Sequence, residues 1–255
     1  MTKSQWLVCD DPAPMLEALG QRMSQRKLRL FACACCRRVA DLFPDDQWLA
    51  AVEVAERFAD GLAPESELDA VDTKSRASVG AARNLAVAAD KAHSRKRTPA
   101  TANRRAITGA AYSAVLGAWA LPQPVFSALE VAANTSAALG GRAAADALRT
   151  GVTDRAAHAV EEVAVEDESA AQADLLRDLF TDQFRFVVPD HAWFTSDVMA
   201  LAGAIYDRHA FDQLPILADA LQDAGCDNDD VLNHCRANAA HVRGCWIVDM
   251  VLGKV

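Results

Sequence analysis

Hydrophobic residues along most of the chain recur three and four positions apart, which is the spacing of one face of an α-helix. Between residues 46 and 61, for example, Trp48, Val52, Ala55 and Ala59 follow this spacing, and Gly61 ends the segment. Similar apolar segments, separated by Pro, Gly and Asp, predict about ten helices with short connections. The pattern therefore predicts an all-α protein.

The ends of several helices are predicted by residues that favour helix caps. Asp11 followed by Pro12 is a typical helix start, and Pro124 begins a helix that we expect to stop at Gly140 and Gly141. Residues 184–194 break the helical pattern, since aromatic residues and adjacent valines surround a proline there. This segment predicts an extended crossing, with a short β segment as the alternative.

We interpret residues 1–255 as a single helical domain with three parts. Helices of residues 1–92 precede a basic linker at 93–105, and acidic helices of 106–255 pack as one module. Residues 1–127 carry 17 basic and 14 acidic side chains, whereas residues 128–255 carry 9 and 21. With a net charge of −9 the whole chain is a poor general binder of nucleic acid. An exception is a local basic surface formed by Lys91, Arg95, Lys96, Arg97, Arg104 and Arg105.

The chain is expected to be a cytoplasmic protein that does not enter a membrane. No apolar run is long enough to span a bilayer, and the N-terminus lacks the apolar region of a secretory signal. Seven cysteines, an odd number with three crowded together, fit no disulfide framework and indicate reduced thiols.

The three crowded cysteines lie in the predicted helix of residues 28–43. On a helical wheel Cys35 falls inside the apolar stripe, Cys36 lies near its edge, and Cys33 lies on the border towards Arg29. Cys33 and Cys35 point about 200° apart, so the three thiols do not bind one ion. Only Cys33 and Cys36, one turn apart, form a pair. Packing in the core is the favoured interpretation of the stretch, because free cysteine behaves as a small hydrophobic residue.

Possible partners for that pair lie near the C-terminus, where Cys226, His234, Cys235, His241 and Cys245 occur. His241 and Cys245 are four residues apart and share one face of a predicted helix. With Cys33 and Cys36 they would complete a zinc site with three thiolates and one imidazole. A metal-binding protein, with zinc or an iron–sulfur cluster, or a redox-linked protein is therefore one alternative for the function.

The leading hypothesis is a non-enzymatic helical module that binds other proteins. The chain lacks the motifs of nucleotide-binding loops, serine hydrolases and zinc proteases, and its alanine-rich helices and charge asymmetry favour interaction surfaces. A second alternative is an enzyme with a site near Asp190 and His191, extended by His209, because these residues fall in or near the irregular segment.

Two segments resemble a family of uncharacterised planctomycete proteins with no known activity. They are "RKLRLFACACCRR" near the N-terminus and "LADALQDAGCDNDDVLNHCR…HVRGCWIVDMVLGK" near the C-terminus. The resemblance implies a bacterial intracellular protein whose two ends pack together. It assigns no catalytic residue.

Overall fold

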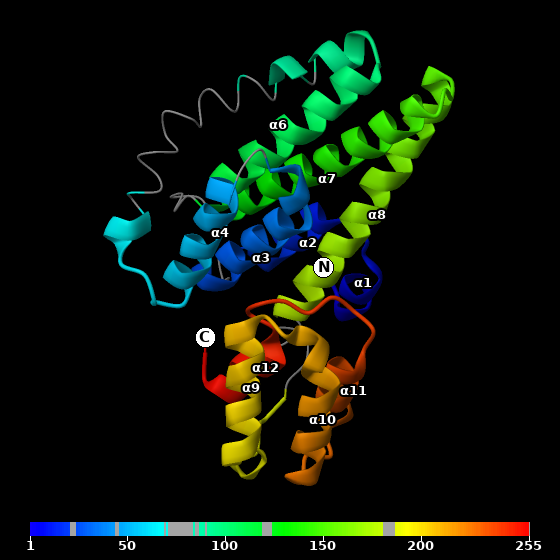
Figure 1. Cartoon of the computed structure of the whole chain (residues 1–255). Coiled ribbons are helices and arrows are strands. Elements are labelled where there is room, and N and C mark those ends of the chain that lie inside the picture. Colours follow the sequence, from blue (N-terminus) through cyan, green and yellow to red (C-terminus); the bar gives the residue numbers. More distant parts are fainter. Residues whose placement is uncertain are drawn as a thin grey trace. The chain divides into compact units, whose positions relative to one another are not determined.

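The structure is a computed structural model that describes residues 1–20, 24–43, 46–68, 70, 84, 87–89, 91–118, 124–180 and 187–254 (Figure 1). Every regular element in these ranges is a helix, so the all-α prediction is confirmed. The chain divides into two compact units. Unit 1 comprises Met1 and Val8–Ala173, and unit 2 comprises Thr2–Leu7 and Asp174–Val255. The packing of all helices as one module stays a prediction.

Unit 1 is built around two long helices, α6 (Pro99–Ala118) and α7 (Pro124–Arg149), which lie side by side (Figure 1). Helix α3 (Gln25–Arg38) packs on both of them and on α4 (Asp46–Ala59). This unit also includes α2 (Pro12–Leu19), the short 3-10 helix η2 (Ala40–Leu42) and most of α8 (Asp154–Phe180).

Asp11 and Pro124 mark helix starts as predicted, but Gly140 and Gly141 do not end the helix that contains them. Asp11 Oδ1 accepts a hydrogen bond from the Ala13 N–H at 2.9 Å, and α2 begins at Pro12. The predicted stop at Gly140 and Gly141 is wrong, because α7 continues to Arg149. A Cβ atom at Gly141 would lie 3.0 Å from the backbone oxygen of Ala102 in α6. These glycines therefore serve the close approach of helices rather than a turn.

The predicted basic linker at 93–105 is also largely wrong. Residues 91–95 are helical, and α6 begins at Pro99, so only residues 96–98 lie outside a helix. Proline is well tolerated in a first helical turn, because its missing N–H has no intrahelical partner there.

The cysteine-rich stretch is core, as predicted. Cys33, Cys35 and Cys36 of α3 are all fully buried. The Cys33 thiol donates to the carbonyl oxygen of Val52 at 3.8 Å, and the Cys36 thiol donates to that of Ser113 at 3.2 Å. Burial raises the pKa of all three thiols, so they remain neutral at physiological pH.

Unit 2 contains most of α1 (Lys3–Val8), the end of α8, and the helices α9 (Ser196–Arg208), α10 (Leu214–Asp223), α11 (Asp229–Arg236) and α12 (Trp246–Leu252). Short 3-10 helices η4 (His191–Trp193) and η5 (Phe211–Gln213) join them. Helix α9 packs against α10 and α12, and α10 packs against α11. Their inner faces form one apolar core that includes Ile205, Leu217, Cys235 and Ile247.

The segment predicted to be extended lies at the start of unit 2. Residues 187–190 have no regular secondary structure, and His191–Trp193 form one 3-10 turn, while residues 181–186 are outside the described ranges. The part that is described contains no β-strand.

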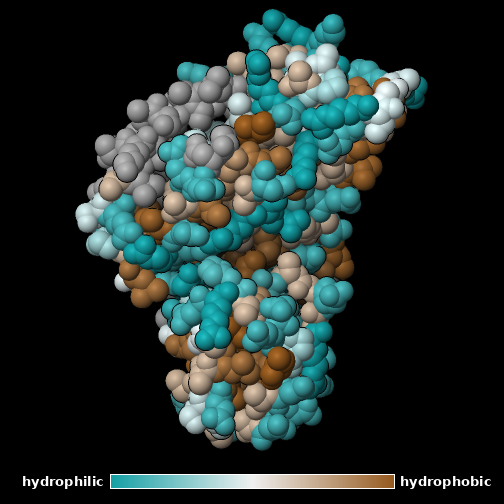
Figure 2. Space-filling view, viewed as in Figure 1, coloured by the Kyte–Doolittle hydropathy of each residue, from teal (hydrophilic) through white to brown (hydrophobic). Residues whose placement is uncertain are grey.

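The visible surface is mostly hydrophilic, with small separate hydrophobic areas on the helices of both units (Figure 2). Of the helices in the described residues, none has the length and apolar character that crossing a membrane requires.

Candidate metal centre

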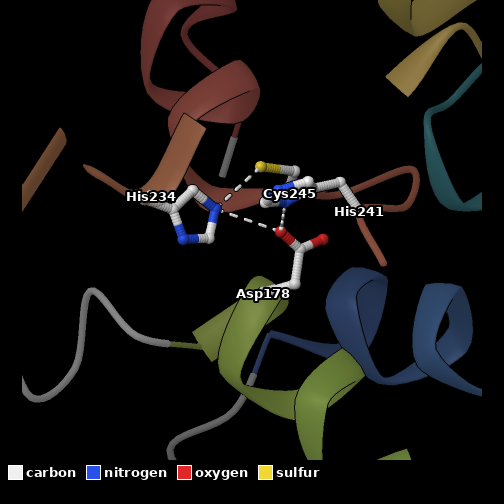
Figure 3. A group of neighbouring side chains, drawn as sticks. All are labelled: Asp178, His234, His241 and Cys245. Atoms are coloured by element: carbon white, nitrogen blue, oxygen red, sulfur yellow. Dashed lines mark hydrogen bonds and ion pairs between the residues drawn. The ribbon is translucent and has the colours of Figure 1, made fainter. Parts of the chain in front are cut away.

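Four side chains of metal-binding type meet inside unit 2 (Figure 3). Asp178 comes from the last turn of α8, and His234 comes from the last turn of α11. His241 and Cys245 lie in the connection that leads to α12. Each residue contributes one ligand atom, and the four atoms lie within 4.8 Å of one another.

A tight turn, and not a helix, brings His241 and Cys245 together. The prediction of a helix that includes both residues is wrong, because α12 begins only at Trp246. Gly244 has φ +93°, a conformation that side chains with a Cβ disfavour, and the Cys245 N–H donates to the Val242 oxygen at 2.9 Å. The two residues therefore face the same cluster through a turn that this glycine permits.

Both oxygens of the Asp178 carboxylate accept hydrogen bonds from the turn. His241 Nδ1 lies 2.7 Å from Asp178 Oδ1, and the Val242 N–H donates to Asp178 Oδ2 at 2.9 Å. His234 Nε2 lies 3.1 Å from the same Oδ1 atom. The side chain of Asp178 is only 3% exposed, so these contacts replace water around its charge.

The imidazoles determine the charge state of this buried carboxyl group. Burial alone would raise the pKa of Asp178, because it disfavours the charged form. Hydrogen bonds from His234 and His241, together with their electrostatic attraction, outweigh burial and lower the pKa to about 2. Asp178 is therefore a carboxylate at physiological pH.

The arrangement does not suit a cysteine nucleophile. His234 Nε2 lies 3.3 Å from Cys245 Sγ and 3.1 Å from Asp178 Oδ1, so one nitrogen faces both groups. In a catalytic triad the carboxylate instead holds the ring nitrogen opposite the nucleophile. Burial, followed by the charge of Asp178, raises the pKa of the Cys245 thiol well above its ordinary value. Cys245 is also fully buried, which separates it from a substrate.

The same geometry suits a metal ion. Bonds of about 2.0–2.3 Å to a tetrahedral zinc ion space its ligand atoms about 3.3–3.8 Å apart. The 3.3 Å contact between His234 Nε2 and Cys245 Sγ falls in this range. His241 Nε2 is buried and has no hydrogen-bond partner among the described residues. A histidine whose Nδ1–H is held by a carboxylate presents a lone pair on Nε2, as metal-bound histidines commonly do. Thiolate, imidazole and carboxylate together are donors that zinc accepts.

The structure brings together two of the four predicted ligands and adds two others. His241 and Cys245 belong to the cluster, whereas Cys33 and Cys36 lie in the core of unit 1, and the four-residue set that combines them stays a prediction. His234 was among the C-terminal candidates. Asp178 was not predicted, because it is one of 35 acidic residues and lies far from the others in sequence.

Asp190, His191 and His209 each make local contacts at the ends of helices η4 and α9. Asp190 Oδ1 caps η4 by accepting from the Ala192 N–H at 2.9 Å, and the His191 ring packs edge-on against Phe194. His209 ends α9 in the left-handed conformation, with φ +54°. All three residues are exposed. An enzymatic site near Asp190 and His191 stays a prediction.

Two residues of the predicted basic surface are paired with a buried acid in unit 1. Arg97 and Arg105 both contact Glu161, and His93 Nε2 lies 3.1 Å from it. These pairs reduce the positive charge that the segment offers to a phosphate. That the chain binds nucleic acid poorly, with Lys91, Arg95, Lys96, Arg97, Arg104 and Arg105 as the one exception, stays a prediction.

No protein-family model matches the chain, and no curated protein or solved structure is significantly similar to it. The resemblance to planctomycete proteins stays a prediction, and the interpretation of the site rests on its own chemistry.

Proposed function

We propose that this protein binds a divalent transition-metal ion, Zn²⁺, through the group formed by Asp178, His234, His241 and Cys245. The observation that carries the proposal is the convergence of one carboxylate, two imidazoles and one thiol within 4.8 Å. Three of these side chains are at least 95% buried, and a buried charge is normally paired or bound to a metal.

The ion would have a clear mechanical consequence for unit 2. It would join the end of α8, the end of α11 and the turn before α12, which are separate segments of the chain. Metal binding to residues far apart in sequence stabilises the folded state, because the unfolded chain does not hold the ligands together. The proposal therefore includes a stabilising role for the ion.

The test is elemental analysis of the purified full-length protein, followed by removal of metal with a chelator and titration with Zn²⁺. We expect one Zn²⁺ per chain, and Cys245→Ser and His234→Ala to lose it. Cys235→Ala and His191→Ala are matched controls, since neither side chain belongs to the cluster. A protein that takes up no Zn²⁺, or one whose control variants lose Zn²⁺ equally, contradicts the proposal.

The interaction-module hypothesis rests on the missing catalytic motifs and the charge asymmetry, and it stays a prediction. A metal-stabilised unit is compatible with it, because many structural zinc sites shape protein-binding domains.

A further inference from the structure

A pocket of about 240 Å³ opens beside the metal-binding group in unit 2. Asp178, His234 and His241 all line this pocket, whereas Cys245 does not and is fully buried. An ion among the four side chains would therefore have packed protein on its cysteine side and a cavity on the side of the imidazoles. Closed structural zinc sites have four protein ligands, and sites that exchange ligands keep one position open.

The hydrogen bonds of Asp178 indicate that it does not occupy a coordination position of the metal ion. Its two oxygens already accept from His241 Nδ1 and the Val242 N–H, at 2.7 and 2.9 Å, and His234 Nε2 lies 3.1 Å from Oδ1. A carboxylate engaged in this way typically orients a metal-bound histidine from the second layer around the ion. His241 Nε2, buried and without a partner among the described residues, is then the nitrogen left for the ion. Three direct protein ligands would remain.

The wall of the pocket indicates the chemistry of the exchangeable ligand. Arg177, one residue before Asp178, lines the pocket, and its side chain is 19% exposed. Its Nε and Nη2 donate to Asp174 Oδ1 at 3.1 and 2.8 Å, and its Nη1 donates to the Trp6 carbonyl oxygen at 3.2 Å. Asp174 is half exposed, so solvent screens the charge of that pair. Guanidinium groups match the geometry of carboxylates. The pocket of about 240 Å³ has room for a small molecule.

Resting on the proposed function, we propose that His234, His241 and Cys245 bind the metal ion directly and that Asp178 positions His241. The fourth coordination position of the ion faces the pocket. It binds a small carboxylate, whose negative charge is stabilised by the guanidinium of Arg177. Water occupies this position when the carboxylate is absent.

The probe for this proposal is acetate, added to the full-length protein in which Co²⁺ replaces Zn²⁺. Co²⁺ has visible absorption bands that change when one of its ligands changes. We expect acetate, but not its neutral analogue acetamide, to shift these bands at constant ionic strength. Arg177→Met should weaken acetate binding about tenfold, whereas Arg208→Met, at the end of α9, should not. Circular dichroism and Co²⁺ content show whether each variant is folded and loaded.

Asp178→Ala tests the positioning role. We expect this variant to keep one Co²⁺ per chain with an affinity about 10–100-fold weaker, which is the usual effect of losing a second-layer partner. Loss of all Co²⁺ from Asp178→Ala, while Arg177→Met stays loaded, would show that Asp178 is a direct ligand and would overturn the inference. A loaded wild-type protein whose bands do not respond to acetate also overturns it but leaves the proposed function standing. Failure of the wild-type protein to bind any Co²⁺ or Zn²⁺ overturns both.

Discussion

Asp178 and His241 are 63 residues apart in sequence, yet His241 Nδ1 lies 2.7 Å from the carboxylate of Asp178 inside unit 2. Both side chains are at least 95% buried. The pair therefore links the end of α8 to the turn before α12 even in the metal-free protein, and it has consequences for stability that depend on pH.

The metal-free protein should lose stability as the pH falls from about 4 to about 2. The pKa of Asp178 is about 2 in the folded state, against an ordinary value of 3.8. A lowered pKa contributes stability above the unfolded value and loses it as the pH falls through the folded one, here about 2 kcal/mol. Urea unfolding at several pH values, with metal removed, should show that the free energy of unfolding of the wild type falls between pH 4 and pH 2. The free energy of unfolding of Asp178→Asn should depend less steeply on pH. An equal pH dependence in the two proteins would contradict the prediction.

Removal of the metal should lower the thermal stability of the protein. An ion that binds only the folded state stabilises it by about 4 kcal/mol at a free concentration of about 1,000 times Kd. We expect calorimetry to show a lower Tm after chelation, and readdition of Zn²⁺ to restore it. Cys245→Ser should have the same low Tm whether or not Zn²⁺ is added, because it does not bind the ion. A rise in the Tm of this variant on addition of Zn²⁺ would contradict the proposed site.

The sequence predicted the helical architecture well, because helix formation depends on local spacing and cap residues. The sequence predicted less well which faces of each helix are buried against neighbouring helices. The helical wheel placed Cys33 on a border, yet α4 covers Cys33 and α6 covers Cys36, so both sides of α3 are buried. A single amphipathic stripe does not describe a helix that packs on several neighbours.

The candidate site was predicted in part and for a wrong local reason. His241 and Cys245 are neighbours, but through a turn at Gly244 and not through a helix face. Asp178 has no local signal, since its sequence surroundings resemble those of any acidic helix. Its role depends on the tertiary structure, which no periodicity in the chain encodes.

The prediction that Cys33 and Cys36 bind the metal has a direct test. If the cluster in unit 2 is the site, the double variant Cys33→Ala, Cys36→Ala should keep its full Zn²⁺ content. It should be less stable by about 1 kcal/mol for each sulfur, because each deletion leaves a small cavity in the core. Elemental analysis and urea unfolding measure both effects. Loss of Zn²⁺ from a variant that is still folded would instead support the set of Cys33, Cys36, His241 and Cys245.

Tyr206 should support the metal site without binding the ion. Arg243 lies between the proposed ligands His241 and Cys245 in sequence. Its guanidinium carbon lies 4.7 Å from the centre of the Tyr206 ring, and Lys254 Nζ lies 4.6 Å from that centre. Each cation–π contact contributes about 0.5–2 kcal/mol. Tyr206→Leu should weaken Zn²⁺ affinity about tenfold by loosening the turn, as measured by competition with a chromophoric chelator. Tyr206→Phe keeps the ring and should keep most of the affinity. Equal losses in both variants would show that the hydroxyl group, and not the ring, is responsible.

Gly141 should be needed for the contact between α6 and α7 in unit 1. A Cβ atom at this position would lie 3.0 Å from the Ala102 oxygen and 3.2 Å from the Ala106 nitrogen, both of which are backbone atoms that move only with α6. Gly141→Ala should therefore destabilise the protein by about 1–3 kcal/mol, although alanine favours a helix by about 1 kcal/mol over glycine. Gly203→Ala in α9 is the matched control, because the added Cβ would have no atom within 4 Å apart from its chain neighbours and the nearby backbone of its own helix. This variant should be as stable as the wild type or slightly more stable. If urea unfolding shows that both substitutions stabilise, the helices of unit 1 separate easily and the close approach at Gly141 has no energetic importance.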